Sequence, residues 1–303
     1  MATERELKRR IRTVKNTSQI TAALAAISAS KANRAQSAVM ATRAYAGKAF
    51  EILNNLASSQ AAKSHPMLVG REEIKNVAVI VITGDRGLAG PYNSDIIRLV
   101  ENFNGKMEDV AENMRFVAVG RKGQEMLIRR GRDVMATFTN MPDPPRSTDI
   151  TPIAKVVVDD YLDGKLDQVF VAFTDFVNMV TRYPRIKQLL PLAPTDFTGG
   201  PVAEFFEDQA AKDEDGASSD YTYEPAADEL LNAIVPRFVD LQLYQSYLES
   251  LASEHSARYI AMNNATDNAK ALIEDLTLAR NKARQAQITA EILDIVGGAE
   301  AIS

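Results

Sequence analysis

The sequence predicts an α/β domain inserted between two long helices that pair with each other as an antiparallel coiled coil. Three observations lead to this fold class. Uncharged residues recur at steps of three and four along both ends of the 303-residue chain, whereas the middle alternates short apolar runs with amphipathic stretches. We therefore expect four parts: an N-terminal coiled-coil helix at 1–62, a Rossmann-like α/β domain at 74–195, an acidic surface insertion at 196–223, and a C-terminal coiled-coil helix at 224–303.

The N-terminal helix is expected to begin at Thr3, because Thr3 and Glu6 have the spacing of a capping box. A helix over 4–60 would be roughly 85 Å long. Its uncharged positions form a seam along the helix: Leu7, Ile11, Val14, Ser18, Thr21, Ala25, Ser28, Ala32, Ala35, Val39, Thr42, Ala46, Ala49, Leu53 and Leu56. This spacing predicts a helix that packs along one face for its whole length.

The C-terminal helix is expected over 226–296, roughly 105 Å, with Pro236 either kinking it or marking a second start and Gly297-Gly298 stopping it. Its seam at steps of 3.5 residues is typical of a left-handed coiled coil. The positions are Leu241, Tyr244, Leu248, Leu251, His255, Arg258, Met262, Ala265, Ala269, Leu272, Leu276, Ala279, Ala283, Ala286, Ala290 and Leu293. His255 and Arg258 interrupt the seam, and we interpret them as a polar break that sets register, with a functional role as the alternative.

Between the helices, the periodicity predicts an α/β sandwich with a largely parallel sheet. The expected strands are 76–83, 115–119, 133–139, 168–176 and 185–192, and the expected helices are 93–112, 121–131 and 150–163. Residues 204–220 are acidic and mostly without period, so we expect a mobile surface insertion there.

Composition excludes several function classes. The net charge of −5 and pI of about 5.3 give no overall attraction to nucleic acid, and a chain without cysteine has neither disulfides nor thiolate sites. The two histidines, His65 and His255, lack metal-ligand spacing, so we expect no metal and no cofactor. No apolar run is long enough to cross a membrane. The basic stretch 8–15 favours a partner with an acidic surface.

The stretch Thr83–Gly90 lies where a dinucleotide fold keeps its phosphate loop. Its glycines at 84, 87 and 90 do not match a phosphate-loop pattern, and Asp85 brings a negative charge into the loop. A tight strand-to-helix turn that serves a protein contact is the simpler interpretation. A nucleotide-binding α/β protein with helical dimerisation arms remains the alternative function, and an unrelated coiled-coil scaffold is a third.

The alanine-rich seam predicts a slender helix pair with little apolar surface of its own to bury. We hypothesise that other subunits enclose it, whereas an ordinary hairpin buried in its own domain is the alternative. Helices of the estimated lengths would overhang an α/β domain of compact radius ~14 Å, which favours the enclosed shaft.

Three segments resemble the ATP synthase gamma subunits of bacterial type. They are ITAEILDIVGGA at 288–299, TGDRGLAGPYN at 83–93 and IRTVKNTSQITAALAAISASK at 11–31, and the resemblance covers nearly the whole chain in order. It implies a non-catalytic central-stalk rotor of the proton-translocating F-type enzyme, which couples rotation to conformational change at the catalytic beta subunits and regulates ATPase activity and proton flow. The implied partners are the alpha and beta subunits as a hexameric sleeve, the epsilon subunit and the c-ring. The implied location is peripheral, on the cytoplasmic face of the bacterial plasma membrane.

The same resemblance implies which residues contact partners. Arg284, Gln285 and Thr289 match positions that contact beta, Arg86 lies in a loop that touches an acidic lever of beta, and Arg258 and Glu291 match positions tied to rotor coupling. The chain departs from the family pattern at Gln19, Ala22 and Leu24, where relatives carry two basic residues and a methionine, so Leu24 holds a family contact position with a different side chain. Ala89 replaces a cysteine of many relatives, and the acidic insertion has no dithiol.

Overall fold

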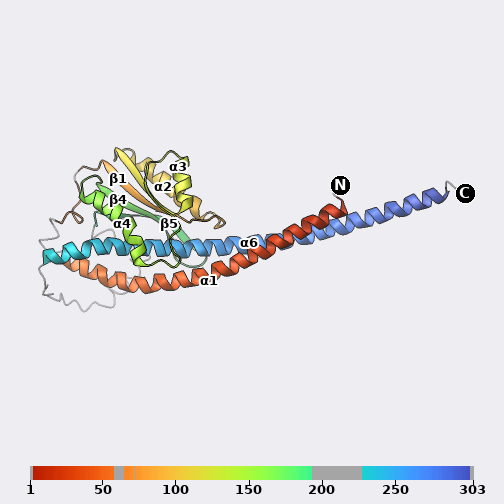
Figure 1. Ribbon diagram of the computed structural model, residues 1–303, viewed down its shortest axis with the longest axis horizontal. Helices are drawn as coiled ribbons and strands as arrows, with labels where there is room; N and C mark the ends of the chain where they lie inside the picture. The colour runs from red at the N-terminus through yellow and green to blue at the C-terminus, as the bar shows by residue number, and fades with distance from the viewer. Residues whose placement is uncertain (1–2, 58–64, 72, 193–226, 301–303) are drawn as a thin grey trace. The chain divides into compact units, whose positions relative to one another are not determined.

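The computed structural model describes residues 3–57, 65–71, 73–192 and 227–300 (Figure 1). The chain divides into two compact units. Unit 1 consists of Met1–Ala29 and Arg258–Ser303, and unit 2 consists of Ser30–Ala257. The two long helices, α1 (Glu4–Ala57) and α6 (Ala227–Glu300), contribute residues to both units. The acidic insertion expected at 196–223 falls within residues 193–226, which lie outside the described part of the chain.

Unit 2 is built on a five-stranded sheet in the order β3-β2-β1-β4-β5. The strands are β1 (Asn76–Ile82), β2 (Asn113–Val119), β3 (Val134–Phe138), β4 (Gln168–Phe176) and β5 (Arg182–Leu190). The first four are parallel, and β5 pairs antiparallel with β4. The run NVAVIVI forms the central strand because its branched apolar side chains are buried on both faces, as a covered parallel sheet requires.

Helices cover both faces of this sheet. Alternate side chains of β1, among them Val79, pack against α2 (Tyr92–Met107) and α3 (Arg121–Arg129). The intervening ones, among them Ile80, pack against α4 (Ser147–Leu162) and the unit 2 segments of α1 and α6. Figure 1 shows these two segments running alongside each other next to the sheet. The α/β fold with two long terminal helices, which the sequence predicts, is confirmed.

The seam expected on the N-terminal helix, which we call the α1-side seam, is correct wherever its side chains are described. Every seam position from Leu7 to Ala49 is buried or half-buried, and Ala32 and Val39 are fully buried. The side chains of Leu53 and Leu56 lie outside the described part. The capping box is also present, because the Glu6 amide donates to Thr3 Oγ1 at 3.3 Å and the Thr3 amide donates to Glu6 Oε2 at 3.1 Å.

The seam of α6 is wrong toward its C-terminal end. Met262 and Ala269 are buried, but Leu272, Ala279, Ala286, Ala290 and Leu293 are exposed. Within unit 1, Thr21 meets Thr266, and the helices run in opposite directions, so Glu4, the first residue of α1, lies opposite about Ala283. Beyond that residue α1 offers Ala286, Ala290 and Leu293 nothing to pack against. Leu272 and Ala279 precede it, and there the next residues, Ile273 and Arg280, are half-buried instead, so the expected seam is off by one residue at these two positions.

Other expected boundaries need correction. α6 continues through Gly297-Gly298 to Glu300, and it contains Pro236 within one helix instead of starting again there. α2 ends at Met107 rather than at 112, and at this end the Glu108 amide still donates to the Asn104 carbonyl. β5 begins at Arg182 rather than at 185. The two differences in α6 arise because glycine and proline lower helix propensity without forbidding a helix that is favoured by its neighbours.

Candidate interaction surfaces

The first surface is the end of α6 in unit 1, which we call the α6 tip, residues 284–296. Arg284, Gln285, Thr289 and Glu291 are all exposed on it. Large apolar side chains are exposed beside them: Ile288 at 48%, Ile292 at 54%, Leu293 at 65%, Ile295 at 71% and Val296 at 54%. A helix with a mixed apolar and polar surface and no packing partner within its own unit is typical of a helix that binds another chain.

The helical backbone brings the predicted residues of the α6 tip together. Gln285 and Thr289 are four residues apart, so they lie on the same face, and Thr289 Oγ1 donates to the Gln285 carbonyl at 2.9 Å. Glu291 accepts a hydrogen bond from Gln287 Nε2 at 2.9 Å. Arg258 is not part of this group, because it lies half-buried near the other end of unit 1, about 39 Å from Arg284 along the helix.

A second surface lies on α1 around Leu24, in unit 1. Leu24 is half-buried, and its neighbours on the same face, Ile20 and Ile27, are 61% and 54% exposed. Their spacing of four and three residues places the three side chains in one stripe beside the buried seam positions Thr21, Ala25 and Ser28. Sequence reasoning missed Ile20 and Ile27, although this second apolar stripe is visible in the sequence.

The loop after β1 carries Arg86 in unit 2. Arg86, Gly87 and Leu88 form its exposed tip, and Leu88 is 67% exposed with φ 64°. Ala89 behind the tip is buried with Tyr92 and Ala257. The turn is tight as expected, but its left-handed residues are Leu88 and Gly90, not Gly84 or Gly87.

Asp85 fixes the base of this loop. Its carboxylate accepts the Arg121 amide at the start of α3 at 3.0 Å and the Asn140 amide at 2.9 Å. A carboxylate is a favourable partner for the positive end of the helix macrodipole. The Asp85 carboxylate is therefore engaged within the fold at the start of α3, which follows β2, whereas a dinucleotide fold binds its phosphate at the helix that follows the first strand.

Gly84 lies close to the side chain of Glu254 on α6. A Cβ there would lie 2.6 Å from a carboxylate oxygen of Glu254 on α6. The Gly84 amide donates to Asn93 Oδ1 at 2.9 Å. The glycine thus allows the end of β1 to approach α6 closely.

Asp143 joins α1 to α6 within unit 2. Its Oδ2 atom lies 2.7 Å from Lys31 Nζ and 3.1 Å from His255 Nε2. The hydrogen bond with His255 lowers the pKa of Asp143, burial opposes this shift, and Lys31 adds to it. His255, which interrupts the seam, therefore has a carboxylate partner within the fold, as the interpretation of a polar break requires.

The remaining histidine is structural as well. His65 Nδ1 accepts the Met67 amide at 3.2 Å, and burial lowers the pKa of His65 while a hydrogen bond with Asn232 opposes that shift. Among the described residues, no group of acidic and histidine side chains could hold a metal ion. In the same part of the chain, no helix is long and apolar enough to cross a membrane.

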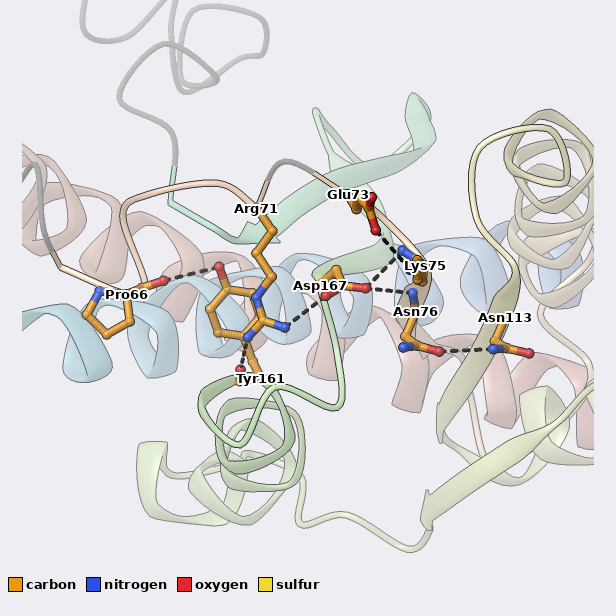
Figure 2. Close-up of polar contacts among 8 residues, drawn as sticks. All are labelled: Pro66, Arg71, Glu73, Lys75, Asn76, Asn113, Tyr161 and Asp167. Carbon is orange, nitrogen blue, oxygen red and sulfur yellow. Dashed lines mark hydrogen bonds and ion pairs between the residues drawn. The ribbon is translucent and has the colours of Figure 1, made fainter.

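Figure 2 shows a polar network that anchors the segment before β1. Arg71 lies 5.0 Å from the centre of the Tyr161 ring and donates to the Tyr161 carbonyl at 2.6 Å and to Asp167 Oδ1 at 2.8 Å. The other Asp167 oxygen accepts the Lys75 and Asn76 amides at 2.9 and 2.8 Å. Burial raises the pKa of Asp167, but these hydrogen bonds outweigh it and lower that pKa. The members of this network bond to one another within the chain, which indicates a structural role.

Sequence reasoning also missed a cluster of two buried carboxyl groups and two half-buried arginines in unit 2. Arg43 lies on α1, Asp175 on β4, Arg185 on β5 and Glu249 on α6. Asp175 and Glu249 are 2% and 3% exposed. Each residue belongs to a different element, so no spacing in the sequence brings them together.

Comparisons with known proteins agree with this geometry. A family model described as ATP synthase matches residues 3–302. The chain is 42% identical over 304 residues to a protein of Roseiflexus castenholzii called ATP synthase gamma chain, covering 100% of this chain and 99% of that one. It is 41% identical over 305 residues to the ATP synthase gamma chain of Chloroflexus aurantiacus, covering 100% of both.

Two solved structures have the same fold. One is from the central stalk and c-ring of the Tetrahymena thermophila mitochondrial ATP synthase, with TM-score 0.61, 23% identity, and coverage of 81% of this chain and 99% of that one. The other is from the Euglena gracilis mitochondrial ATP synthase, in a structure of OSCP, F1 and the c-ring, with TM-score 0.63, 18% identity, and coverage of 99% and 94%. At these identities the likeness shows a shared fold.

Proposed function

The chain belongs to the family of ATP synthase gamma chains, and from this premise we propose that it is the central-stalk rotor of an F-type ATP synthase. As the rotor it couples rotation driven by proton flow to conformational change at the catalytic beta subunits. It also regulates ATPase activity and proton flow, because neither can proceed in a coupled complex unless the shaft turns.

The α6 tip is the observation that carries this proposal. Fully burying one large aliphatic side chain contributes about 1.5–3 kcal/mol, and five such side chains on the tip are about half or more exposed. Enclosure by apolar walls of other subunits would therefore stabilise the complex considerably. A single helix is also narrow enough to fit inside a narrow sleeve formed by other subunits.

The chain itself is non-catalytic in this proposal, and nucleotides bind to its partners. Asp85 supports this, because it brings a negative charge into the loop between β1 and α2, where a dinucleotide fold would bind its phosphate group. The chemistry belongs to the alpha and beta subunits. The rotor supplies an asymmetric surface that makes the three catalytic sites differ.

Contacts with partners follow from the surfaces already described. Arg284, Gln285 and Thr289 contact beta on the α6 tip, and Glu291 takes part in coupling from the same exposed helix. Arg86 reaches an acidic segment of beta from the exposed loop after β1. These contacts are charged or hydrogen-bonded and directional, so they suit positions where torque passes between chains.

Two further contacts are in unit 1. Leu24 contributes an apolar contact to the sleeve with Ile20 and Ile27, and Arg258 contributes to coupling from its half-buried position on α6. In this proposal the paired segments 1–62 and 224–303 are the shaft.

The domain at 74–195 meets the epsilon subunit and the c-ring, and 196–223 is a surface insertion. The complex lies on the cytoplasmic face of the plasma membrane, which this chain meets only through the c-ring.

Assembly with the alpha and beta subunits tests the proposal. A variant with Ile292→Gln and Leu293→Gln makes the α6 tip polar without touching a buried side chain of the chain itself. A matched control carries Val110→Gln and Ile128→Gln, which are 52% and 56% exposed in unit 2. We expect the wild-type chain and the control to copurify with an alpha/beta hexamer that hydrolyses ATP, and the tip variant to be retained poorly. The proposal would be contradicted if the hexamer retained all three chains equally, or if it retained none of them.

A further inference from the structure

The carboxyl ends of β1 and β4 lie at a topological switch point of the sheet. In the strand order β3-β2-β1-β4-β5, the chain leaves β1 toward β2 on one side and later returns to β4 on the other. The strand order therefore reverses between β1 and β4. In open α/β sheets, ligands bind in the crevice outside the strand ends at such a point. What fills this crevice in the present chain is therefore informative.

Residues 249–257 of α6, which we call the crevice segment, bond to the end of β4. Ser250 Oγ accepts the Thr174 amide of β4 at 2.9 Å, and Ser253 Oγ donates to the Thr174 carbonyl at 3.2 Å. The pairing of β4 with β1 stops before this point, since the last residue of β4 that pairs with β1 is Ala172. The two serines therefore supply partners for the Thr174 main chain beyond the end of β1.

The crevice segment also lies against the loop that follows β1. A Cβ at Gly84 would lie 2.6 Å from a carboxylate oxygen of Glu254. Ala257 is buried together with Ala89 of this loop and with Tyr92, the first residue of α2. The segment is thus in contact with the end of β4, the loop after β1 and the start of α2, which surround the crevice.

The contacts of the crevice segment come from one face of α6. Ser250, Ser253 and Ala257 are separated by three and four residues, so they project from the same side of the helix. All three side chains are small, and they are 1%, 0% and 2% exposed. So close an approach leaves the serine hydroxyls, rather than solvent, as the partners of the Thr174 main chain.

Ion pairs flank the two serines. Arg185 Nε on β5 lies 2.9 Å from Oδ2 of Asp175, which follows Thr174 on β4. An Nη atom of Arg43 on α1 lies 3.6 Å from Oε1 of Glu249 on α6. Each buried carboxyl group thus has its own guanidinium. Polar contacts therefore hold four elements, α1, β4, β5 and α6, at this end of the sheet.

We propose that Ser250 and Ser253 clamp the main chain of Thr174 and so fasten the crevice segment to the sheet, and that torque passes between the sheet and α6 through this clamp. The α/β domain holds its own helix at the place where related folds hold a ligand. The passage of torque rests on the proposed rotor function, whereas the clamp does not.

The direction of the two hydrogen bonds explains why they suit this task. Apolar packing is non-directional, so it resists sliding of one surface over another only weakly. A hydrogen bond weakens steeply when its angle is bent. With one donor and one acceptor on the same strand residue, rotation or translation of α6 against β4 would bend both bonds. Ser250 and Ser253 are therefore positioning residues for the helix.

Hydrogen exchange of the full chain at single-residue resolution tests the clamp. Ser250→Ala removes the acceptor of the Thr174 amide, so the exchange rate of this amide should rise about tenfold or more. Ser246→Ala is the matched control, because this serine is also buried but donates to the Gln242 carbonyl within α6 at 2.9 Å. The control should exchange like the wild type. An unchanged Thr174 amide in Ser250→Ala would overturn the clamp.

The angular fluctuation of a bead tests the passage of torque. The double variant Ser250→Ala with Ser253→Ala is assembled with the alpha and beta subunits, and the hexamer is fixed to a surface. The bead is attached at Lys106→Cys on α2. While the complex waits for ATP at low concentration, the variance of the bead angle should be larger than in the wild type, and unchanged in Ser246→Ala. A merely structural role of the serines would raise hydrogen exchange without widening this variance.

The outcomes separate this inference from the rotor function. If the wild-type bead rotates and the double variant has the same variance, the passage of torque through the clamp is overturned and the rotor function stands. If the wild-type bead does not rotate, both are overturned, while the Thr174 amide still decides whether the clamp exists. If the hexamer does not retain the double variant, Ser250→Ala alone is measured in the same way, with the same two results deciding.

Discussion

The hydroxyl groups of Thr21 and Thr266 hydrogen-bond to each other at 2.7 Å between α1 and α6 in unit 1. One hydroxyl donates to the other, and the hydroxyl that accepts donates in turn to a carbonyl of its own helix, Thr266 to Met262 at 2.8 Å or Thr21 to Ser18 at 3.1 Å. The pair fixes the register of the two helices, and this register determines that α6 is unaccompanied by α1 beyond about Ala283.

Replacing these threonines should show that they act as a pair. Thr21→Val and Thr266→Val keep the shape of the side chain and remove the hydroxyl group. We expect each to increase hydrogen exchange of the unit 1 amides, and a double-mutant cycle to give a coupling of about 1 kcal/mol. The pair Thr13→Val and Thr17→Val, on the exposed side of α1, is the control. Additive effects at Thr21 and Thr266 would show that the contact does not set the register.

Removing the polar contacts of the α6 tip should weaken its attachment to beta. In the double variant Arg284→Ala with Gln285→Ala, a lost charged hydrogen bond should cost about 1.5–3 kcal/mol, or roughly tenfold or more in binding. Both residues are exposed in the chain itself, so its own stability should hold. The measurements are affinity for the alpha/beta hexamer and coupled ATP synthesis.

An exposed pair on the same helix, Asn268→Ala with Lys270→Ala, controls for the loss of polar side chains in general. Unchanged synthesis in the Arg284 and Gln285 variant would remove both residues from the proposed contact with beta.

Asp85 should stabilise the loop that carries Arg86. Asp85→Ala removes the acceptor for the Arg121 and Asn140 amides, and loss of such a cap typically costs about 1 kcal/mol. We expect faster hydrogen exchange at 84–90 and 138–141, and no gain of nucleotide binding by titration calorimetry. Tight nucleotide binding by the wild-type chain would revive the alternative function.

Acid should weaken the contact between α1 and α6 at Asp143. Because the hydrogen bond with His255 lowers the pKa of Asp143, its stabilising effect is present above about pH 4, the ordinary aspartate value of 3.8, and is lost as the pH falls below it. Asp143→Asn should therefore flatten the acid limb of a stability curve measured with denaturant between pH 2 and 6. Asp109→Asn, at an exposed aspartate, should leave the limb as in the wild type. An acid limb unaffected by Asp143→Asn would contradict this role.

Patterns in the sequence predict the parts of the structure that depend on local repetition. The α1-side seam is correct from Leu7 to Ala49 because steps of three and four residues select one face of a helix. The sheet follows from apolar runs such as 76–82 between amphipathic helices.

What the sequence does not predict depends on pairing between distant segments. The α6 seam beyond Ala283 has no partner, since the length of α1 decides where packing ends, and at Leu272 and Ala279 the half-buried position is one residue later than expected. Asp85 precedes Arg121 by 36 positions, so its contact with the start of α3 is not visible in the sequence either. Asp175 and Glu249 lie 74 positions apart in the chain and on different elements, so only the fold reveals their cluster.

Rotation of a single complex tests the central claim most directly. The chain contains no cysteine, so Lys106→Cys, exposed on α2, can carry a bead as the only thiol while the alpha/beta hexamer is fixed to a surface. The proposed rotor predicts that the bead turns steadily in one direction when ATP is added, and stops in the Ile292→Gln and Leu293→Gln variant if that chain is retained at all. A bead that stays still on the wild-type chain while the hexamer hydrolyses ATP would contradict the account.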